Sequence, residues 1–549
     1  MYKMKVVLTE AAEAIVGKMT DRPIVRPDYT DYTDVGAVVL ADFEKGLLVN
    51  SPVRAFGIPV FFVRTPRTVA GLTPFEAAKA EDGVLADAYG VMDDEPADHE
   101  FYARRLETAI QNYEMRALPP FFRTLRRYVE TGNSQFNCPG HQGGQFFRKH
   151  PAGRAFYDFF GEEIFRSDLC NADVQLGDLL IHEGYALDAQ EHAAQVFNAD
   201  KTYFVLNGTS MSNKVVLNAV LAPDDIVLYD RNNHKSVCHG ALVQAGARPV
   251  YLETARNPFG SIGGILEHCF DEDYIRGLIA EVDPEKAKEK RPVRLAVIQL
   301  GTYDGTIYNA RQVIDKIGHL CDYILFDSAW VGYEQFIPMM KDCSPLLLDL
   351  GPEDPGIFVT QSVHKQMAGF SQTSQIHKKD LHIKGQDRYV NQKRFNNAFM
   401  MHASTSPFYP LFAALDVNAK IHEGESGRRL WAECVELGIE SRKAILARCK
   451  LFRPFIPPVV DGKLWQDYPT SVLASDRRFF SFEPGAKWHG FEGYAADQYF
   501  VDPCKLLLTT PGIDAETGEY LCDIKDDGQE VIIFPGGDRK STRLNSSHT

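Results

Sequence analysis

The sequence predicts an α/β protein built around a mostly parallel sheet. Between about residue 160 and residue 425, short apolar runs alternate with glycine-containing turns and helix-like segments. Gly356–Thr360 and Tyr323–Phe326 are two such runs, and their unbroken apolar character is typical of strands buried on both faces. The chain has 549 residues, 44% hydrophobic and 24% charged, which indicates a globular protein of several domains.

The totals exclude several classes of protein. A net charge of −15 argues against nucleic-acid binding, which needs a basic surface. No run of about 18 apolar residues is present, so no membrane-spanning helix is predicted. The start of the chain lacks the pattern of a signal peptide, and ten cysteines occur without paired spacing. These features predict reduced thiols and a cytoplasmic protein.

Residues 1–105 are predicted to form a small α/β domain. Gly36–Leu40 and Ile58–Val63 indicate buried strands, and Ala77–Glu81 indicates a helix. Residues 106–160 follow as a helical linker, in which a helix starts at Pro119–Pro120. No chemistry is apparent in the first of these segments.

The first strand of the central pattern is Thr202–Leu206, and it leads through a glycine and two hydroxyl residues into the helix Met211–Leu221. Gly208, Thr209 and Ser210 therefore lie at a helix N-terminus, where free N–H groups and the helix dipole can hold a phosphate. An ordinary capped helix after a glycine turn explains the same residues equally well.

His234 follows the next strand, Asp225–Tyr229, at the sheet edge where α/β proteins bind ligands. Its planar ring suits stacking on a cofactor, and an ordinary surface histidine is the alternative. Cys238 between His234 and His239 permits a metal site, as does the turn carrying Cys138 and His141. The Cys138–His141 pair has no second pair of ligands at a convincing distance, and stacking is the better functional interpretation of His234, so no metal is predicted.

Two more strand ends carry ionisable groups. Tyr323–Phe326 runs directly into Asp327, an acid that is costly to bury without a cationic partner. Gly356–Thr360 leads to Ser362, His364 and Lys365. A partly buried lysine loses its charge more easily, and the neutral amine can form a Schiff base. A sheet-end aspartate and a solvated lysine remain the alternatives for each residue alone.

Taken together, the strand ends match one cofactor. They supply a hydroxyl cradle, a flat histidine, a buried acid and a lysine. Pyridoxal 5'-phosphate (PLP) needs a phosphate anchor, a partner for its ring face, a partner for its ring nitrogen and a Schiff-base amine. The combination predicts a PLP enzyme more specifically than any single residue does.

The motifs that carry these residues resemble those of the bacterial ornithine/lysine/arginine decarboxylase family. The shared motifs are Pro139–Gln142, Asn207–Ser210, Asn233–Ser236, Phe326–Trp330 and Gln361–Lys365. Gly332–Pro338 and Phe370–Asp380 are similar to the ornithine decarboxylase branch in particular. The likeness runs from about residue 110 to Tyr520.

The resemblance implies a domain organisation. A flavodoxin-like wing domain (1–105) and the helical linker (106–160) would precede an aspartate-aminotransferase-like PLP core (161–425). Residues 426–520 would begin a C-terminal α/β domain, which in the family supplies an acid that grips the far end of the substrate. The likeness stops after Tyr520, and residues 521–549 are predicted to be an aberrant, disordered tail of a truncated chain.

The resemblance also implies roles for individual residues. Lys365 would hold PLP, Asp327 would pair with the ring nitrogen, His234 would stack on the ring, and Trp330 would lie near it. The phosphate would be held by Gly208, Thr209, Ser210, Ser362 and His364. Thr405 and Ser406 would reach the phosphate of a neighbouring subunit, because the family builds its site across a homodimer, and dimers often assemble into rings.

The activity implied is decarboxylation of L-ornithine, a small basic amino acid, to putrescine and CO2, in polyamine biosynthesis or acid response. Either His364 or Lys365 could donate the proton that replaces the carboxylate. A lysine or arginine decarboxylase is the nearest alternative, and an aminotransferase or carbon–sulfur lyase on the same fold is a more distant one. A fragment that dimerises without turnover is the alternative from another class.

Overall fold

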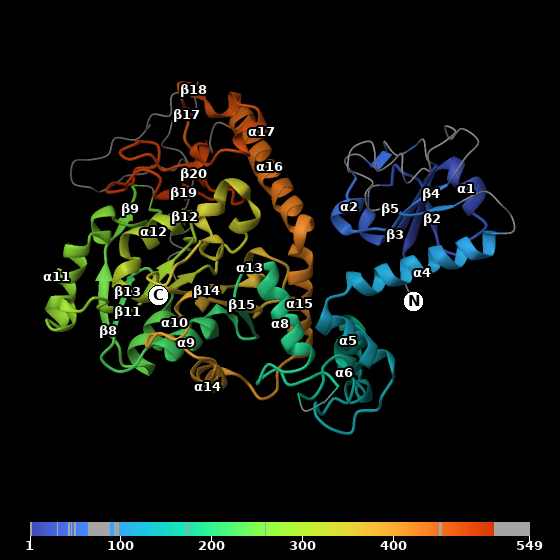
Figure 1. Cartoon of the computed structure of the whole chain (residues 1–549), viewed down its shortest axis with the longest axis horizontal. Coiled ribbons are helices and arrows are strands. Elements are labelled where there is room, and N and C mark those ends of the chain that lie inside the picture. The colour runs from blue at the N-terminus through green and yellow to red at the C-terminus, as the bar shows by residue number, and fades with distance from the viewer. Residues whose placement is uncertain are drawn as a thin grey trace. The chain divides into compact units, whose positions relative to one another are not determined.

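The computed structural model describes residues 3–29, 31–41, 44, 47–48, 51–63, 88–92, 98–171, 173, 175–258, 260–449 and 453–509 (Figure 1). The described residues of Met1–Arg127 and Lys420–Arg429 form one compact unit, and those of Tyr128–Ala419 and Leu430–Thr549 form another. The predicted helix at 77–81 and the predicted tail at 521–549 lie outside the described residues. None of the helices in the described ranges is long and apolar enough to cross a membrane.

The first unit contains a five-stranded parallel sheet. Its strands are β1 (Lys5–Leu8), β2 (Ile24–Val25), β3 (Val35–Ala41), β4 (Val60–Val63) and β5 (Ala88–Met92). They pair in the order β2-β1-β3-β4-β5, which is the strand order of flavodoxin-like folds. The strands predicted at 36–40 and 58–63 are confirmed as β3 and β4.

Helices cover this sheet through their apolar faces. They are α1 (Glu10–Val16), α2 (Val53–Phe56) and α4 (His99–Ala117). Leu106 and Ile110 of α4 are buried in a cluster with β1 and β3, as the spacing of one helical turn requires. Arg22 fixes the same helix by donating hydrogen bonds of 2.8 Å to Glu107 and Glu114.

The chain passes from the first unit to the second between Arg127 and Tyr128. Helix α5 (Pro120–Glu130) begins at Pro120, as predicted, and buries Phe121 and Leu125 on one face. Helices α6 (Pro151–Phe160) and α7 (Glu162–Arg166) follow a glycine-rich turn. In that turn His141 Nε2 lies 3.0 Å from Asp168 Oδ2.

The second unit is organised around a seven-stranded sheet with the order β6-β15-β14-β13-β11-β7-β8. Its strands are β6 (Lys201–Val205), β7 (Ile226–Asp230), β8 (Arg248–Leu252), β11 (Val293–Gln299), β13 (Cys321–Asp327), β14 (Gly356–Gln361) and β15 (Ser374–Lys379). Only β15 runs antiparallel to its neighbours in this sheet. The four strands of this sheet predicted from apolar runs are confirmed within two residues as β6, β7, β13 and β14.

Helices and small hairpins surround this sheet (Figure 1). They are α8 (Tyr185–Val196), α9 (Gly208–Val220), α10 (Lys235–Cys238), α11 (Glu272–Val282), α12 (Ala310–Ile317), α13 (Val363–Gln366), α14 (Gln392–His402), α15 (Tyr409–His422), α16 (Gly424–Arg448) and α17 (Thr470–Leu473), with β9 (Thr254–Arg256) paired to β10 (Ile262–Ile265). Helix α9 packs against the sheet and α14, and buried residues of all three share one hydrophobic cluster.

The C-terminal segment joins the core through short strands. β12 (Thr306–Tyr308) pairs antiparallel with β19 (Tyr499–Val501), and β16 (Arg453–Pro454) pairs with β20 (Leu508–Thr509). A further hairpin consists of β17 (Val459–Val460) and β18 (Lys463–Leu464).

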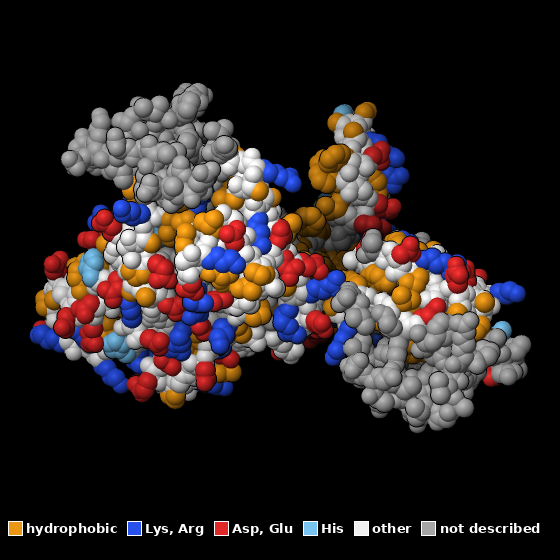
Figure 2. All heavy atoms as spheres, turned by 90° about the horizontal axis from the view of Figure 1, so that it is seen from above, with side chains coloured by type: hydrophobic (Ala, Val, Ile, Leu, Met, Phe, Trp, Pro, Cys, Tyr) orange, Lys and Arg blue, Asp and Glu red, His pale blue; other side chains and the backbone are white. Residues whose placement is uncertain are grey.

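Figure 2 shows acidic and basic side chains interspersed over the face seen from above.

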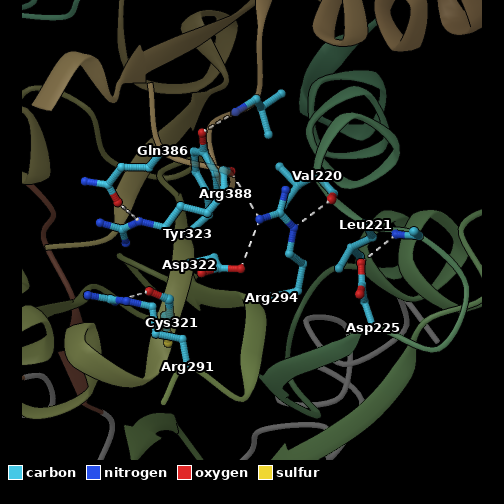
Figure 3. A network of polar contacts seen from close by, with 12 residues as sticks. Val220, Leu221, Asp225, Arg291, Arg294, Cys321, Asp322, Tyr323, Gln386 and Arg388 are labelled. Atoms are coloured by element: carbon cyan, nitrogen blue, oxygen red, sulfur yellow. Dashed lines mark hydrogen bonds and ion pairs between the residues drawn. The ribbon is translucent and has the colours of Figure 1, made fainter. Parts of the chain in front are cut away.

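The amino ends of the core strands are held by an arginine network (Figure 3). Arg294 of β11 donates a hydrogen bond of 3.0 Å to Asp322 of β13 and others to the carbonyls of Val220 and Arg388. These contacts give hydrogen-bond partners to the polar groups at the starts of the strands. The opposite edge, where the parallel strands end, carries the residues predicted for the site.

Candidate functional site

Asp327 is the last residue of β13 and is buried, with 4% of its surface exposed. Both carboxylate oxygens accept hydrogen bonds. Oδ2 accepts one of 2.8 Å from the side-chain amide of Asn213, and Oδ1 accepts one of 3.0 Å from the backbone N–H of Ala329. These two donors fix the orientation of the carboxylate at the sheet edge.

Asn213, on α9, is itself held in place. Its side-chain oxygen accepts a hydrogen bond of 2.8 Å from the hydroxyl of Thr360, and its nitrogen also reaches Ser236 Oγ at 3.1 Å. This residue was not predicted from the sequence. The available signal was a polar amide one turn after Thr209, on the same face of the helix.

His234 follows β7 and caps the short helix α10. Its Nδ1 lies 2.8 Å from Ser236 Oγ, and the ring is exposed. Because Ser236 also contacts Asn213, the imidazole and Asp327 belong to one hydrogen-bonded chain across three elements.

Four hydroxyl groups gather beside the start of α9. Thr209 Oγ1 lies 2.7 Å from Ser362 Oγ and 3.1 Å from Ser374 Oγ, and Ser212 Oγ lies 2.7 Å from Ser374 Oγ. Ser374 and Ser362 come from strand β15 and from the residue before α13, so the cluster joins α9 to the Lys365 segment. All four side chains are buried.

The helix N-terminus predicted as an anion cradle is present, with one correction. Helix α9 begins at Gly208 rather than at Met211, so Thr209 and Ser210 form its first turn. Gly208 has φ of +68°, which glycine adopts without strain, and its N–H donates to the carbonyl of Gln372 at 2.8 Å. Asn207 makes no side-chain cap hydrogen bond. Asn207 therefore does not cap the N–H groups of the first turn. An anion site requires first-turn N–H groups that are left available in this way.

Lys365 lies on α13, directly after β14. Its Nζ is 4.1 Å from the centre of the Trp330 ring, which in turn meets Tyr303 edge to face at 4.7 Å. Burial lowers the pKa of the Lys365 amine; the charge of Asp327 opposes this effect, and the positive charge of Lys505 adds to it. The amine therefore loses its proton more readily than an ordinary lysine.

His364 is fixed by its backbone neighbour. The Nδ1–H donates a hydrogen bond of 2.8 Å to the carbonyl oxygen of Thr373, which can only accept. This contact assigns the proton to Nδ1 and leaves Nε2 as the ring nitrogen able to accept a proton.

Thr405 and Ser406 lie exposed in the segment between α14 and α15. Ser406 lines a cavity of about 510 Å³, together with Asn207 at the start of α9 and Gln372. In its own chain this serine therefore borders the same end of α9. The predicted contact of Thr405 and Ser406 with a neighbouring subunit stays a prediction.

A metal site was one of the alternatives for the turn that carries Cys138 and His141. Within the described part of the chain, no group of three His, Cys, Asp or Glu side chains is arranged to hold a metal ion. Cys138 Sγ instead lies 3.4 Å from Cys170 Sγ, and His141 pairs with Asp168.

A mostly parallel sheet with a lysine, an acid, a histidine and a hydroxyl cluster at its carboxyl edge defines an α/β protein of the aspartate-aminotransferase-like class. The chain belongs to the Orn/Lys/Arg decarboxylase family: residues 119–526 match the model of the family's major domain. The family predicted from the motifs is thereby confirmed.

The relatives are similar over most of this chain. It is 70% identical to the constitutive ornithine decarboxylase of Escherichia coli K12 over 520 residues, which are 94% of this chain and 71% of that protein. It is 68% identical to the ornithine decarboxylase of Haemophilus influenzae over 502 residues, 91% of this chain and 68% of that protein. The structure of lysine decarboxylase A from Pseudomonas aeruginosa superimposes with a TM-score of 0.80 and 31% identity, covering 95% of this chain and 72% of that one.

Proposed function

We propose that this protein decarboxylates L-ornithine to putrescine and CO2 with PLP as cofactor. One observation carries the cofactor part: Asn213 donates to Asp327 and accepts from Thr360, on the strand that leads to Lys365. The acid and the lysine that PLP requires are thus tied to one helix, α9, whose first turn suits a phosphate.

The residues fit PLP group by group. Lys365 has an amine whose pKa is lowered by burial, as a Schiff-base lysine needs at neutral pH. Asp327 offers a buried carboxylate for the ring nitrogen, and Thr209, Ser210 and Ser362, with the Gly208 turn, offer hydroxyl and N–H donors for the phosphate. When bound, PLP takes up the electron pair left behind as the carboxylate leaves.

The protein's own groups would then position and move protons. Asp327 would keep a proton on the ring nitrogen of the cofactor, which favours that electron uptake. His234 would lie against one face of the ring, and Trp330, whose ring centre is 4.1 Å from the Lys365 Nζ, would limit the space beside Lys365. The proton delivered to the substrate carbon would come from the Lys365 amine, or from His364 after its Nε2 has taken up a proton; both residues lie on α13.

The preference for ornithine rests on similarity. The chain is 70% and 68% identical to two ornithine decarboxylases, but 38% identical to a lysine decarboxylase of Pseudomonas aeruginosa. Substrate-binding residues are expected to differ between branches with this separation. Ornithine is therefore the substrate favoured over lysine and arginine.

We further infer a homodimer in the cytoplasm, built from a wing domain (1–105), a linker (106–160), a PLP core (161–425) and a C-terminal segment (426–520). Large apolar side chains support an interface on the linker: Phe136 is 91% exposed and Phe159 is 82% exposed. Thr405 and Ser406 would meet the partner's phosphate in such a dimer. Light scattering on the purified chain measures the mass directly, and a monomer at micromolar concentration would contradict the inference.

Release of CO2 from ornithine, lysine and arginine, measured in parallel at equal concentrations, tests the proposed function. We expect ornithine to be decarboxylated at least about tenfold faster than the other two. Lys365→Ala should abolish release, and the exposed Lys384→Ala is the matched control that should leave it unchanged. PLP bound without CO2 from any substrate would favour a non-catalytic, dimerising fragment.

A further inference from the structure

Lys505 is a partly buried cation that has no role in the proposed mechanism. Only 14% of its side chain is exposed, and its Nζ lies 3.2 Å from Asp502 Oδ2. Within the described residues, no hydrogen bond of good geometry reaches this ammonium. An ammonium has three donors, so Lys505 retains the capacity to bind an anionic group.

The turn that carries Lys505 is held rigidly. Arg442 of α16 is 1% exposed and donates hydrogen bonds to the carbonyl oxygens of Asp502, Pro503 and Lys505. Burial lowers the pKa of Arg442 to about 10, which measures the cost of placing a guanidinium there. Three hydrogen bonds from one buried arginine hold the backbone of this turn in a fixed position.

The turn lies against the carboxyl edge of the sheet. The N–H of Asp502 donates a hydrogen bond of 2.8 Å to the carbonyl of Gly305, in the turn after β11. Gly305 has φ of +82°, and a Cβ there would lie 3.7 Å from Cδ of Lys505. The two turns therefore pack directly on each other.

The same turn after β11 leads to the reactive lysine. Tyr303 meets the Trp330 ring at 4.7 Å, and the Lys365 Nζ lies 4.1 Å from that ring. The positive charge of Lys505 lowers the pKa of Lys365, so the two ammonium groups are close enough to repel each other. Lys505 thus belongs to the surroundings of the site.

We propose that Lys505 binds the α-carboxylate of the substrate. The inference rests on the proposed function, in which the α-amine of the substrate takes the place of the Lys365 amine. The α-carboxylate is then one carbon away from that position and needs a charged donor nearby. Holding this carboxylate fixes the rotation of the substrate and so determines which bond to the α-carbon breaks.

The product offers a sharp contrast, because putrescine has lost the carboxylate but keeps both amines. A residue that binds the carboxylate should therefore matter for ornithine and not for putrescine. A residue with a merely structural role should affect the two ligands equally.

The experiment compares Lys505→Met, Lys505→Gln and Lys505→Arg in the full chain loaded with PLP. We expect the two neutral variants to raise KM for ornithine by at least about tenfold, with the inhibition constant of putrescine changed by less than about twofold. Lys505→Arg should retain most of the affinity for ornithine. Lys443→Met is the matched control, since Lys443 is similarly buried and bonds to Thr470 instead.

Thermal unfolding of each variant identifies any that fails to fold, and the remaining neutral variant then decides. Equal weakening of ornithine and putrescine, or no weakening of either, would overturn the assignment. If the wild-type chain itself releases no CO2 from ornithine, the proposed function fails, which is a separate result.

Discussion

The side-chain amide of Asn213 donates a hydrogen bond of 2.8 Å to Oδ2 of Asp327. This bond joins the middle of helix α9 to the end of strand β13, and Thr360 continues it to strand β14. The buried acid is therefore oriented by a residue that lies on the helix whose first turn is the proposed phosphate site. Changes in Asn213 should reach the chemistry through Asp327.

Asn213→Ala should lower kcat/KM for ornithine by about tenfold or more, because Asp327 would lose one of its two donors. The change also leaves the Thr360 hydroxyl buried without its acceptor, so unfolding free energy should fall by about 1–3 kcal/mol. Steady-state kinetics and urea denaturation measure the two effects. Asn218→Ala on the same helix, where the amide bonds to Gly240, should affect stability and spare kcat/KM.

Asp327→Asn should keep PLP bound and lose most of the activity. The amide is nearly isosteric with the carboxylate, but it carries no charge to hold a proton on the ring nitrogen. We expect kcat to fall by about a hundredfold or more. Cofactor content and kcat measured on the same sample check this, and near-normal turnover would refute the role of Asp327.

Ser362→Ala should weaken PLP binding without preventing it. The hydroxyl lies 2.7 Å from that of Thr209, at the end of the cluster nearest Lys365. Loss of one donor to a charged phosphate is worth about 1.5–3 kcal/mol, so the dissociation constant of PLP should rise about tenfold to a hundredfold. Equilibrium dialysis measures it, and an unchanged constant would remove Ser362 from the phosphate site.

The stability of the protein should depend on pH through Glu334. This side chain is 2% exposed, and burial raises its pKa to about 7 from 4.5. A raised pKa means that the folded state binds the proton more tightly than the unfolded state. Below pH 4.5 Glu334 is protonated in both states, and its burial then carries no cost of ionisation. The free energy of unfolding falls as the pH rises through 7.

Glu334→Gln should remove this loss. Its unfolding free energy should exceed that of the wild type by about 2–3 kcal/mol at pH 8, with a smaller difference at pH 5. Urea denaturation at the two pH values measures the difference. An equal difference at both would show that Glu334 does not titrate in this range.

The sequence alone placed three candidate site residues at the ends of strands, and the structure has them there. Asp327 ends β13, and His234 and Lys365 each lie four residues after a strand. Parallel strands end at one edge of a sheet, so residues at their ends can be grouped from the sequence. Asn213 was hidden within a helix, where its polar character alone does not show which strand it faces. Lys505 was hidden for a different reason: it reaches the site through the β12–β19 pairing and the Arg442 contacts, which join segments more than sixty residues apart.

The antiparallel strand β15 was also not predictable from the pattern of apolar residues. Its residues Ser374–Lys379 are polar, although the strand lies between β14 and β6 and is largely buried. The Ser374 hydroxyl donates a hydrogen bond to the carbonyl of Gln361, and the Gln375 side-chain N–H donates one to the Gln361 side-chain oxygen, so these two donors have partners inside the sheet. Periodicity rules read such a segment as a loop because they expect apolar residues at buried positions.

Reduction with borohydride identifies the lysine that holds PLP, which we propose is Lys365. The PLP-loaded protein is treated with borohydride, digested, and mapped by mass spectrometry. We predict a pyridoxyl group on the peptide that contains Lys365, and none in Lys365→Ala. A pyridoxyl group on a different lysine of the wild-type chain, or on none, would contradict the account.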